Sequence, residues 1–454
     1  MMELINPFIE KRLKNNGALL FKRIMERKVV SLRKLGDTRS ERVRFERWIG
    51  NEKVTVADLI KTEQARLRLI VKNRHVLAIQ DTTELNYQKH ANRVKGLGTV
   101  GNGKDKGFFI HPMLVLDAET TACLGSAAIH IENRLKGANE HYEKLPIEEK
   151  ESYRWISTAE ASKKTLVEAD CVTFIGDREN DIYEFIDRIP DEKTHILTRV
   201  WHDRCLEDGD KVFSHLEKKI ESGQLIVQVR QDKRNNREKR EALLSIKHSE
   251  VVIKRPKPCT DKAAAKTIKL TIVEAKEINC PTNQKPIHWA LLTTHKVTNF
   301  DEATQIILWY RTRWNVEQIF RTMKKQGLDV ESSQIESAES LMKLAVIALS
   351  AAILILQLVL ARDGETNQKT SDVFGEEEKI VLGKLLIKLE GKTIKQKNPY
   401  PSENLSWASW IIARLGGWNG YKNERPGPNT MGWGLQRFQG IFDGWKLIKD
   451  VCAE

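Results

Sequence analysis

The segment from Trp309 to Lys324 reads WYRTRWNVEQIFRTMK, and it decides how the rest of the chain is interpreted. Within it, Tyr310, Arg313, Glu317 and Lys324 are separated by three, four and seven residues. At about 100° per residue, these positions on one helix fall within roughly 60° of one another. The spacing therefore predicts one helix that presents an acid framed by two cations and a phenol.

An apolar stripe runs beside these polar residues and would face a core; it consists of Trp309, Val316, Phe320 and Met323. A carboxylate in that setting can hold a metal ion, while the cations and the phenol bind phosphate. The spacing alone leaves a second interpretation open, because an amphipathic surface helix with ordinary ion pairs has the same pattern.

Two further acids follow apolar, strand-like runs upstream. Residues 75–87 read HVLAIQDTTELNY and contain Asp81, and residues 172–181 read VTFIGDREND and contain Asp177. Together with the Tyr-x2-Arg-x3-Glu-x6-Lys pattern around Glu317, these motifs resemble those of bacterial DDE cut-and-paste transposases of the IS-four group, the Tn-five type. The resemblance continues to WASWIIARLGGW at residues 407–418 and covers roughly residues 40–450.

The resemblance implies that Asp81, Asp177 and Glu317 are the catalytic residues and the metal ligands. We expect two Mg²⁺ (or Mn²⁺) ions per active site, with Asp81 bridging both, Asp177 holding one and Glu317 the other. Two such ions activate an oxygen nucleophile and stabilise the leaving oxygen. Water would be the first nucleophile, and the freed 3′ hydroxyl the second. None of the eleven histidines forms a His-x-x-x-His pair, which argues against a zinc hydrolase.

The same resemblance implies a set of DNA contacts. Phosphates of the transposon end would be bound by Tyr310, Arg313, Lys324 and Arg199. This group of transposases excises DNA through a hairpin, which requires a base to leave the helix. Trp289, in HWALLTT at residues 288–294, corresponds to the tryptophan on which that base stacks, and Trp314 to an aromatic residue that supports the distorted backbone. For either tryptophan, a place in the core is the open alternative. Glu179 and Asp181 would join the metal ligands or cap the helix that follows.

The composition agrees with a nucleic-acid partner. The 454-residue chain is long enough for two or three domains, and its formal charge of +13 suits nucleic acid, a membrane surface or the ribosome. Six cysteines without Cys-x-x-Cys pairs indicate a reduced cytosolic protein without a structural zinc site. The first sixteen residues mix acids and bases, unlike a signal peptide. We therefore expect a cytoplasmic, nucleoid-associated protein.

One apolar segment imitates a membrane span. Residues 344–361 meet the length rule, and Ser350 and Gln357 are their only polar residues. The segment follows Glu317 closely and has neither a second span nor a clearly asymmetric basic flank. We therefore predict a buried helix packed across a sheet, and no membrane partner.

The order of the elements predicts an α/β fold: a ribonuclease H-like catalytic core with a mixed five-stranded sheet flanked by helices, an antiparallel β insertion, and helical N- and C-terminal regions. This order places Asp81 on the first strand, in the middle of the sheet, and Asp177 at the end of the fourth strand. The expected strands are 76–81, 108–116, 122–132, 172–175 and 195–200, with helices at 159–169 and 181–188. The predicted domains are 1–72, a DNA-end-binding region; 73–200 with 286–362, the core; 201–285, the insertion; and 363–454, a dimerisation region.

The insertion and the N-terminus carry two further predictions. Alternating runs at 224–231, 241–246, 250–254 and 266–273 indicate antiparallel strands, and the basic turn at 233–240 is either a solvated hairpin tip or a DNA-backbone contact. Members of the transposase group begin with a Leu-Gly-Asp-x-Arg block well ahead of an Asn-Glu-Lys-Val-Thr segment. Here those letters occur at 35–39, far too close to 51–55, so we interpret them as chance or as a remodelled N-terminus.

The predicted function is a DNA transposase that excises and inserts a transposon by metal-dependent phosphodiester hydrolysis and strand transfer, through a hairpin intermediate. Its partners would be double-stranded transposon ends with inverted repeats, target DNA, and a second copy of the chain in a synaptic complex. One alternative is a truncated or domesticated DNA-binding relative that inhibits transposition, and another is a nuclease of the same fold. Retention of all three acids favours the enzyme.

Overall fold

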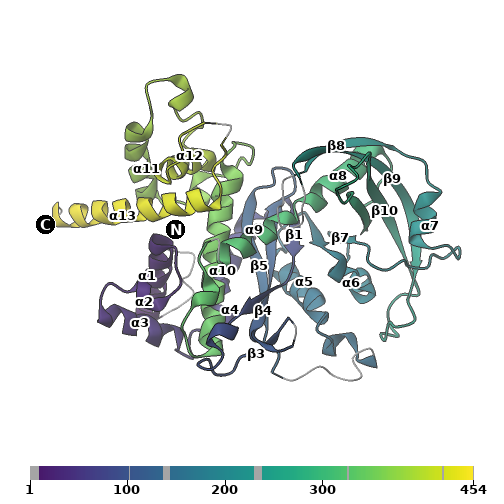
Figure 1. Cartoon of the computed structure of the whole chain (residues 1–454), viewed down its shortest axis with the longest axis horizontal. Coiled ribbons are helices and arrows are strands. Elements are labelled where there is room, and N and C mark those ends of the chain that lie inside the picture. The colour runs from purple at the N-terminus through teal and green to yellow at the C-terminus, as the bar shows by residue number, and fades with distance from the viewer. Residues whose placement is uncertain are drawn as a thin grey trace. The chain divides into compact units, whose positions relative to one another are not determined.

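The computed structural model describes residues 10–101, 103–135, 144–229, 238–324, 327–421 and 424–452. The chain forms two compact units, whose elements are labelled in Figure 1. The helical unit comprises Met1–Lys72, Thr82–Gly137 and Asn315–Glu454, and the sheet unit comprises Asn73–Asp81 and Ala138–Trp314. Each unit therefore contains part of the predicted core.

The helical unit begins with four helices: α1 (Lys11–Arg27), α2 (Leu32–Leu35), α3 (Arg39–Ile49) and α4 (Val56–Ile70). Their apolar faces pack on one another, and the buried indole of Trp48 donates to the carbonyl oxygen of Leu13 at 2.8 Å. A capping box between Thr55 and Asp58 starts α4, because each residue satisfies a backbone amide that the first helical turn leaves unpaired.

The Leu-Gly-Asp-x-Arg letters at 35–39 have a local structural use. The Thr38 hydroxyl accepts from the amide of Glu41 and caps α3, and Asp37 forms ion pairs with Arg23 and Arg27 of α1. These contacts hold α1 and α3 together within this unit.

The helical unit also contains four antiparallel strands: β2 (Thr83–Asn86), β3 (Gly98–Val100), β4 (Asp105–Asp117) and β5 (Cys123–Glu132). The long strand β4 pairs with each of the others. The predicted strands at 108–116 and 122–132 correspond to β4 and β5. Two irregularities in the β4–β5 register, at Met113/Leu114 and Val115/Leu116, bend this hairpin.

The apolar segment at 344–361 lies within helix α10 (Ala338–Ala361), which packs against β5 and α4. Among the described residues it is the one helix long and apolar enough to cross a membrane, and 89% of its apolar window is buried inside the protein. The Gln357 side chain donates to the Cys123 carbonyl oxygen at 3.1 Å, which joins α10 to β5. These contacts agree with the predicted buried helix. The unit continues with α11 (Glu376–Leu389), α12 (Leu405–Leu415) and α13 (Pro428–Cys452).

The sheet unit contains seven strands in the order β1-β6-β7-β11-β10-β9-β8. Strands β1 (His75–Gln80), β6 (Cys171–Gly176) and β7 (Thr194–Arg199) are parallel. Strands β11 (His288–Thr293), β10 (Thr267–Ile278), β9 (Arg240–Lys254) and β8 (Gly223–Val229) continue the sheet in antiparallel fashion. The predicted insertion strands therefore extend the core sheet, because β11 pairs with β7 on one side and with β10 on the other.

One prediction for this region was wrong in detail, and one strand was not predicted. The runs at 241–246 and 250–254 form one strand, β9, since its pairing with β10 passes without a break through the polar residues Lys247 to Ser249. The segment 288–294 was not expected to be a strand, yet it forms β11. Of the basic turn at 233–240, residues 233–237 lie outside the described part of the chain, and Arg240 is held by Glu277 at 2.8 Å.

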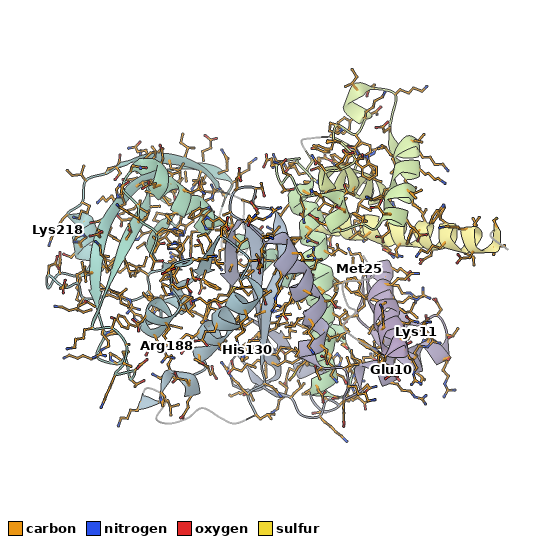
Figure 2. All side chains as sticks on the ribbon, turned by 180° about the vertical axis from the view of Figure 1, so that it is seen from behind. Glu10, Lys11, Met25, His130, Arg188 and Lys218 are labelled. Atoms are coloured by element: carbon orange, nitrogen blue, oxygen red, sulfur yellow. The ribbon has the colours of Figure 1, made fainter. Side chains whose placement is uncertain are left out.

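Helices α5 (Tyr153–Thr165) and α6 (Tyr183–Arg188) lie between the parallel strands in the chain, and α7 (Val212–Glu217) and α8 (Phe300–Arg311) follow. Arg188, labelled in Figure 2, ends α6 and reaches Glu148 and Asp261, both at 2.7 Å. Helix α8 packs on β9 and β10 (Figure 1). The structure confirms the predicted mixed α/β class, with the antiparallel pair β4–β5 and the parallel strands β1, β6 and β7 in the expected chain order.

Candidate active site

The helix predicted across residues 309–324 is interrupted. Helix α8 ends at Arg311 and α9 (Trp314–Met323) begins three residues later. Between them, the amide and the hydroxyl of Thr312 both donate to the Trp309 carbonyl oxygen, at 3.0 and 2.6 Å. The amide of Arg313 likewise donates to a carbonyl three residues back, that of Tyr310, at 3.1 Å. This tight turn ends the helix because a threonine hydroxyl competes for backbone partners.

The break changes the geometry expected for the four signature residues. Tyr310 lies in the last turn of α8, Arg313 in the connection, Glu317 in the first turn of α9, and Lys324 just beyond its end. A count of 100° per residue does not apply across such a break. Tyr310 and Arg313 belong to the sheet unit, and Glu317 and Lys324 to the helical unit.

Asp81 and Asp177 occupy matching places in the sheet unit. Asp81 directly follows β1, within one residue of the predicted strand end at 81, and Asp177 directly follows β6. The register between the strands pairs His75 with Cys171 and Ile79 with Ile175, at one constant offset. The same offset, continued past the strand ends, sets Asp81 beside Asp177, and neighbouring strands are about 4.8 Å apart. The two carboxylates therefore lie next to each other at the C-terminal ends of the parallel strands.

Arg199 lies on the next strand, beside Asp177. Gly176 is paired with Thr198, so the continued register sets Asp177 beside Arg199, the last residue of β7. The Arg199 guanidinium donates to the His288 carbonyl oxygen at 2.7 Å, which fixes it toward β11. We call Asp81, Asp177 and Arg199 the strand-end row.

A cation already faces the first carboxylate. Arg313 Nη1 lies 2.8 Å from Asp81 Oδ2, and the two side chains are 13% and 16% exposed. At that low exposure the ion pair is partly shielded from water, so its two charges depend on each other more than surface charges do. The Asp81 carboxylate is therefore held against the Arg313 guanidinium.

Tyr310 connects the row to an aromatic residue. Its side chain is buried, which raises the pKa of the phenol, while the charges of Arg313 and Arg199 oppose that shift. Burial also lowers the pKa of Arg199, whose side chain is hydrogen-bonded to Tyr310. The Tyr310 ring meets the half-buried ring of Trp289 edge-on, with centroids 5.7 Å apart. Arg199, Arg313, Tyr310 and Trp289 thus form one connected group.

Of the two predicted tryptophans, Trp314 is exposed and Trp289 is half-buried. Trp314 is 38% exposed, and the Arg313 guanidinium lies 5.9 Å from the centroid of its ring. Trp289 is half-buried against Tyr310 and is not enclosed among the insertion strands. The core interpretation that the sequence left open is therefore wrong for Trp314 and unsupported for Trp289.

Asp177, Glu179 and Asp181 make different contacts. The Asp177 carboxylate accepts from the amide of Glu179 at 2.8 Å and so caps the short turn η5 (Arg178–Asn180). Glu179 itself is exposed and lies 3.6 Å from Arg154. Asp181 is buried and paired with Arg204 at 2.6 Å, so it anchors the fold and does not join the carboxylates of the strand-end row.

Glu317 and Lys324 are placed within the helical unit. Lys324 Nζ lies 3.9 Å from Glu331, whose carboxylate also accepts from the amide of Asn86 at 3.0 Å. The approach of Glu317 to Asp81 and Asp177 stays a prediction. In the described ranges, no three His, Cys, Asp or Glu side chains are gathered closely enough to hold a metal ion. The two-ion site therefore also stays a prediction.

Sequence reasoning missed two residues at this edge. Arg178 follows Asp177, and Trp201 follows Arg199 by two positions. Their side chains meet, with the guanidinium carbon 5.3 Å from the centroid of the indole ring. Their adjacency to two predicted site residues was the signal that was available.

Residues 157–354 match the family described as "Transposase DDE domain". This segment is similar to the DDE domain of transposases. Every predicted site residue except Asp81 lies inside the matched segment. The match confirms an enzyme of the DDE transposase type, which cleaves DNA and transfers strands, and this family generally uses divalent metal ions. It does not distinguish the IS-four group from other DDE transposases.

A solved structure also shows a slight likeness to this transposase. The cryo-EM structure of the piggyBac transposase synaptic complex with hairpin DNA has a TM-score of 0.36 and 11% sequence identity. The alignment covers 77% of this chain and 70% of that chain. At that level of similarity no residue is carried from one protein to the other.

Proposed function

We propose that this transposase excises and inserts an IS-four-type element by hydrolysis and strand transfer, with a hairpin intermediate. The observation that carries the proposal is the strand-end row. Two carboxylates and an arginine stand next to one another on parallel strands, and Arg313 faces one of the carboxylates at 2.8 Å. Acidic residues that can bind metal ions and arginines that can bind phosphate therefore lie together at the C-terminal ends of these strands.

The acids fit divalent metal ions. Asp81 and Asp177 offer carboxylate oxygens, the ligands that Mg²⁺ and Mn²⁺ prefer, and Glu317 would complete the set. The Arg313 guanidinium beside Asp81 supports this fit, since the edge already holds a positive charge at that carboxylate. When bound, two ions would activate the attacking oxygen and stabilise the leaving oxygen.

The bases and the phenol fit the DNA backbone. Arg313 would exchange its carboxylate partner for a phosphate as the DNA enters, and Arg199 would hold the next phosphate with the Tyr310 hydroxyl as its partner. Lys324 would leave Glu331 in the same way. The half-buried Trp289 ring, supported by Tyr310, suits an extruded base.

A second copy of the chain fits the C-terminal helix. Four large apolar side chains are exposed along the last part of α13, namely Ile441, Leu447, Ile448 and Val451, at 41–66%. Exposed apolar residues gathered on one helix mark a protein interface more often than single ones do. We assign this stretch to the homodimer of the synaptic complex.

The test is an excision assay with Mg²⁺ on DNA that carries the sequences flanking the gene. A transposase cuts at both ends and leaves a hairpin or its opened product on denaturing gels. A binding-only relative that inhibits transposition shifts the same DNA without cutting it. A nuclease cuts but joins no end to a target plasmid, so the three functions give three different results.

A further inference from the structure

An exposed tryptophan stands at the edge of the sheet unit that carries the strand-end row. Trp201 is 58% exposed, and it lies two residues beyond Arg199 at the end of β7. Arg178, which directly follows Asp177, places its guanidinium 5.3 Å from the centroid of the indole ring. The pair therefore lies just past two residues of the row.

The backbone beneath Trp201 is held in place on both sides. The amide of Val200 donates to the Ala290 carbonyl oxygen at 2.8 Å, which extends the β7–β11 pairing by one residue. The amides of Trp201 and His202 then both donate to Asp181 Oδ2, at 2.8 and 2.9 Å. The exposed ring is thus mounted on a fixed support.

A buried ion pair maintains that support. Arg204 donates to Asp181 Oδ1 from Nε at 2.9 Å and from Nη2 at 2.6 Å, and the two side chains are 4% and 0% exposed. Such a pair adds little net stability, because removing two charges from water costs about what their attraction returns. What it provides here is a defined path for the segment from Trp201 to Arg204. A fold that fixes an exposed indole in this way prepares it for a ligand.

We propose that Trp201 and Arg178 form a stacking site for one nucleobase of the DNA strand beside the cleaved phosphate. The inference rests on the proposed function, since it takes DNA as the substrate. Indole faces accept any base, and one such stack strengthens binding about 5- to 150-fold. Arg178 covers the indole from one side and brings a positive charge toward the backbone of the same strand.

This site is separate from Trp289. Trp289 precedes Ala290, and Trp201 follows Val200, so the two tryptophans flank the same backbone hydrogen bond on neighbouring strands. The Trp289 ring meets Tyr310, whereas the Trp201 ring meets Arg178. The two rings thus have different partners, and we assign them to two different nucleotides.

The test uses the full chain and two DNA probes: a blunt duplex of one transposon end, and the same duplex with a short single-stranded extension past the cleavage position. 5-Iodouracil at successive positions of the extension allows crosslinking by light, and mass spectrometry locates the crosslinked peptide. We expect a crosslink to Trp201 at one position of the extension. Trp201→Ala should weaken binding of the extended probe about 10-fold and leave the blunt duplex within twofold.

Two variants sharpen the result. Trp201→Phe keeps an aromatic face and should bind within threefold of the parent. Trp433→Ala is the matched control, because Trp433 is 51% exposed with Lys28 over its ring, yet it belongs to the helical unit. If the parent binds and cuts DNA while Trp201→Ala binds the extended probe equally well, or the crosslink maps elsewhere, the inference fails alone. If the parent binds neither probe, the proposed function fails with it.

Discussion

The two ends of the parallel strands β1, β6 and β7 have opposite chemistry. Their C-terminal ends carry the strand-end row, in which Asp81, Asp177 and Arg199 stand side by side and Arg313 pairs with Asp81. The Arg313 guanidinium at Asp81 is a charge that an ionic ligand can replace. This end is suited to binding phosphate and cations.

The N-terminal ends carry a cluster of histidines instead. Thr173 Oγ1 lies 2.7 Å from Nε2 of both His75 and His295, and His295 stacks on His195 with centroids 3.9 Å apart. Burial, together with the neighbouring His195 and His75, lowers the pKa of His295 to about 3. The ring of Trp309 also belongs to this cluster, and its centroid lies 5.2 Å from that of His295. This cluster disfavours a charge on His295 and serves the fold.

The comparison indicates that the two ends of these strands have different roles: the C-terminal ends are suited to the reaction, and the N-terminal ends stabilise the fold. Substitutions at the C-terminal ends should change catalysis with little change in stability. Substitutions at the N-terminal ends should do the reverse.

The largest effect is expected at Asp177. Asp177→Asn keeps the size and the cap on η5 but removes the charge, so DNA cleavage should fall by a factor on the order of 10⁴. The melting temperature should stay within about 3 °C. The control is Thr173→Val at the other end of the same strand, which should lower stability and leave cleavage by the folded protein unchanged. Cleavage by Asp177→Asn within a hundredfold of the parent would contradict the assignment.

The buried pair below the charged end should carry the next effect. Arg204→Ala leaves Asp181 charged and buried, which should lower the free energy of unfolding by about 3–5 kcal/mol. Urea unfolding followed by circular dichroism measures this. Arg188→Ala is the matched comparison, since its partners are more exposed, and it should cost under about 1 kcal/mol. Equal losses in the two variants would show that the Arg204 pair is not special.

Trp289 should affect one step of the reaction at the charged end. Extruding a base costs a few kcal/mol, and stacking on the indole returns about 1–3 kcal/mol. Trp289→Ala should therefore slow hairpin formation about 10- to 100-fold and leave first-strand nicking nearly unchanged. An abasic site at the flipped nucleotide should partly rescue the variant. Equal loss of nicking and hairpin formation would instead assign Trp289 to the fold.

The smallest effect concerns pH at the neutral end. The pKa of His295 is lowered in the folded state, so below about pH 6.5 the unfolded chain binds a proton that the folded chain refuses. Stability should therefore fall as the pH falls, by about 1–2 kcal/mol between pH 7 and pH 5, and remain constant above pH 7. His295→Gln should flatten this dependence in urea titrations. An unchanged slope in that variant would place the effect elsewhere.

The sequence predicted the strands of the charged end well. The apolar runs that stop at Asp81 and Asp177 predicted both strand ends within one residue, because a buried strand ends where charged residues begin. Periodicity failed at Thr312, since a side chain that bonds its own backbone leaves no trace in apolar spacing. It failed again at β9, where three polar residues continue a strand that pairing with β10 maintains.

The pairs that connect distant segments were not predictable. Arg204 reaches Asp181, and Arg178 reaches Trp201, across more than twenty residues of chain. Such contacts depend on how the strands pair, which a single sequence does not state. The family resemblance supplied the DNA contacts, and it could not supply Trp201 because no motif includes that residue.

Because the register between β1 and β6 is constant, the length of each strand determines the position of the acid that follows it. Asp81 and Asp177 come level because each strand runs the same number of residues from its first paired position to its acid. One inserted residue in either strand would turn its acid to the opposite face of the sheet, since side chains alternate with a period of two. Relatives that remain active are therefore expected to vary freely in the composition of these strands but not in their length, and to gather insertions in connections such as residues 202–211.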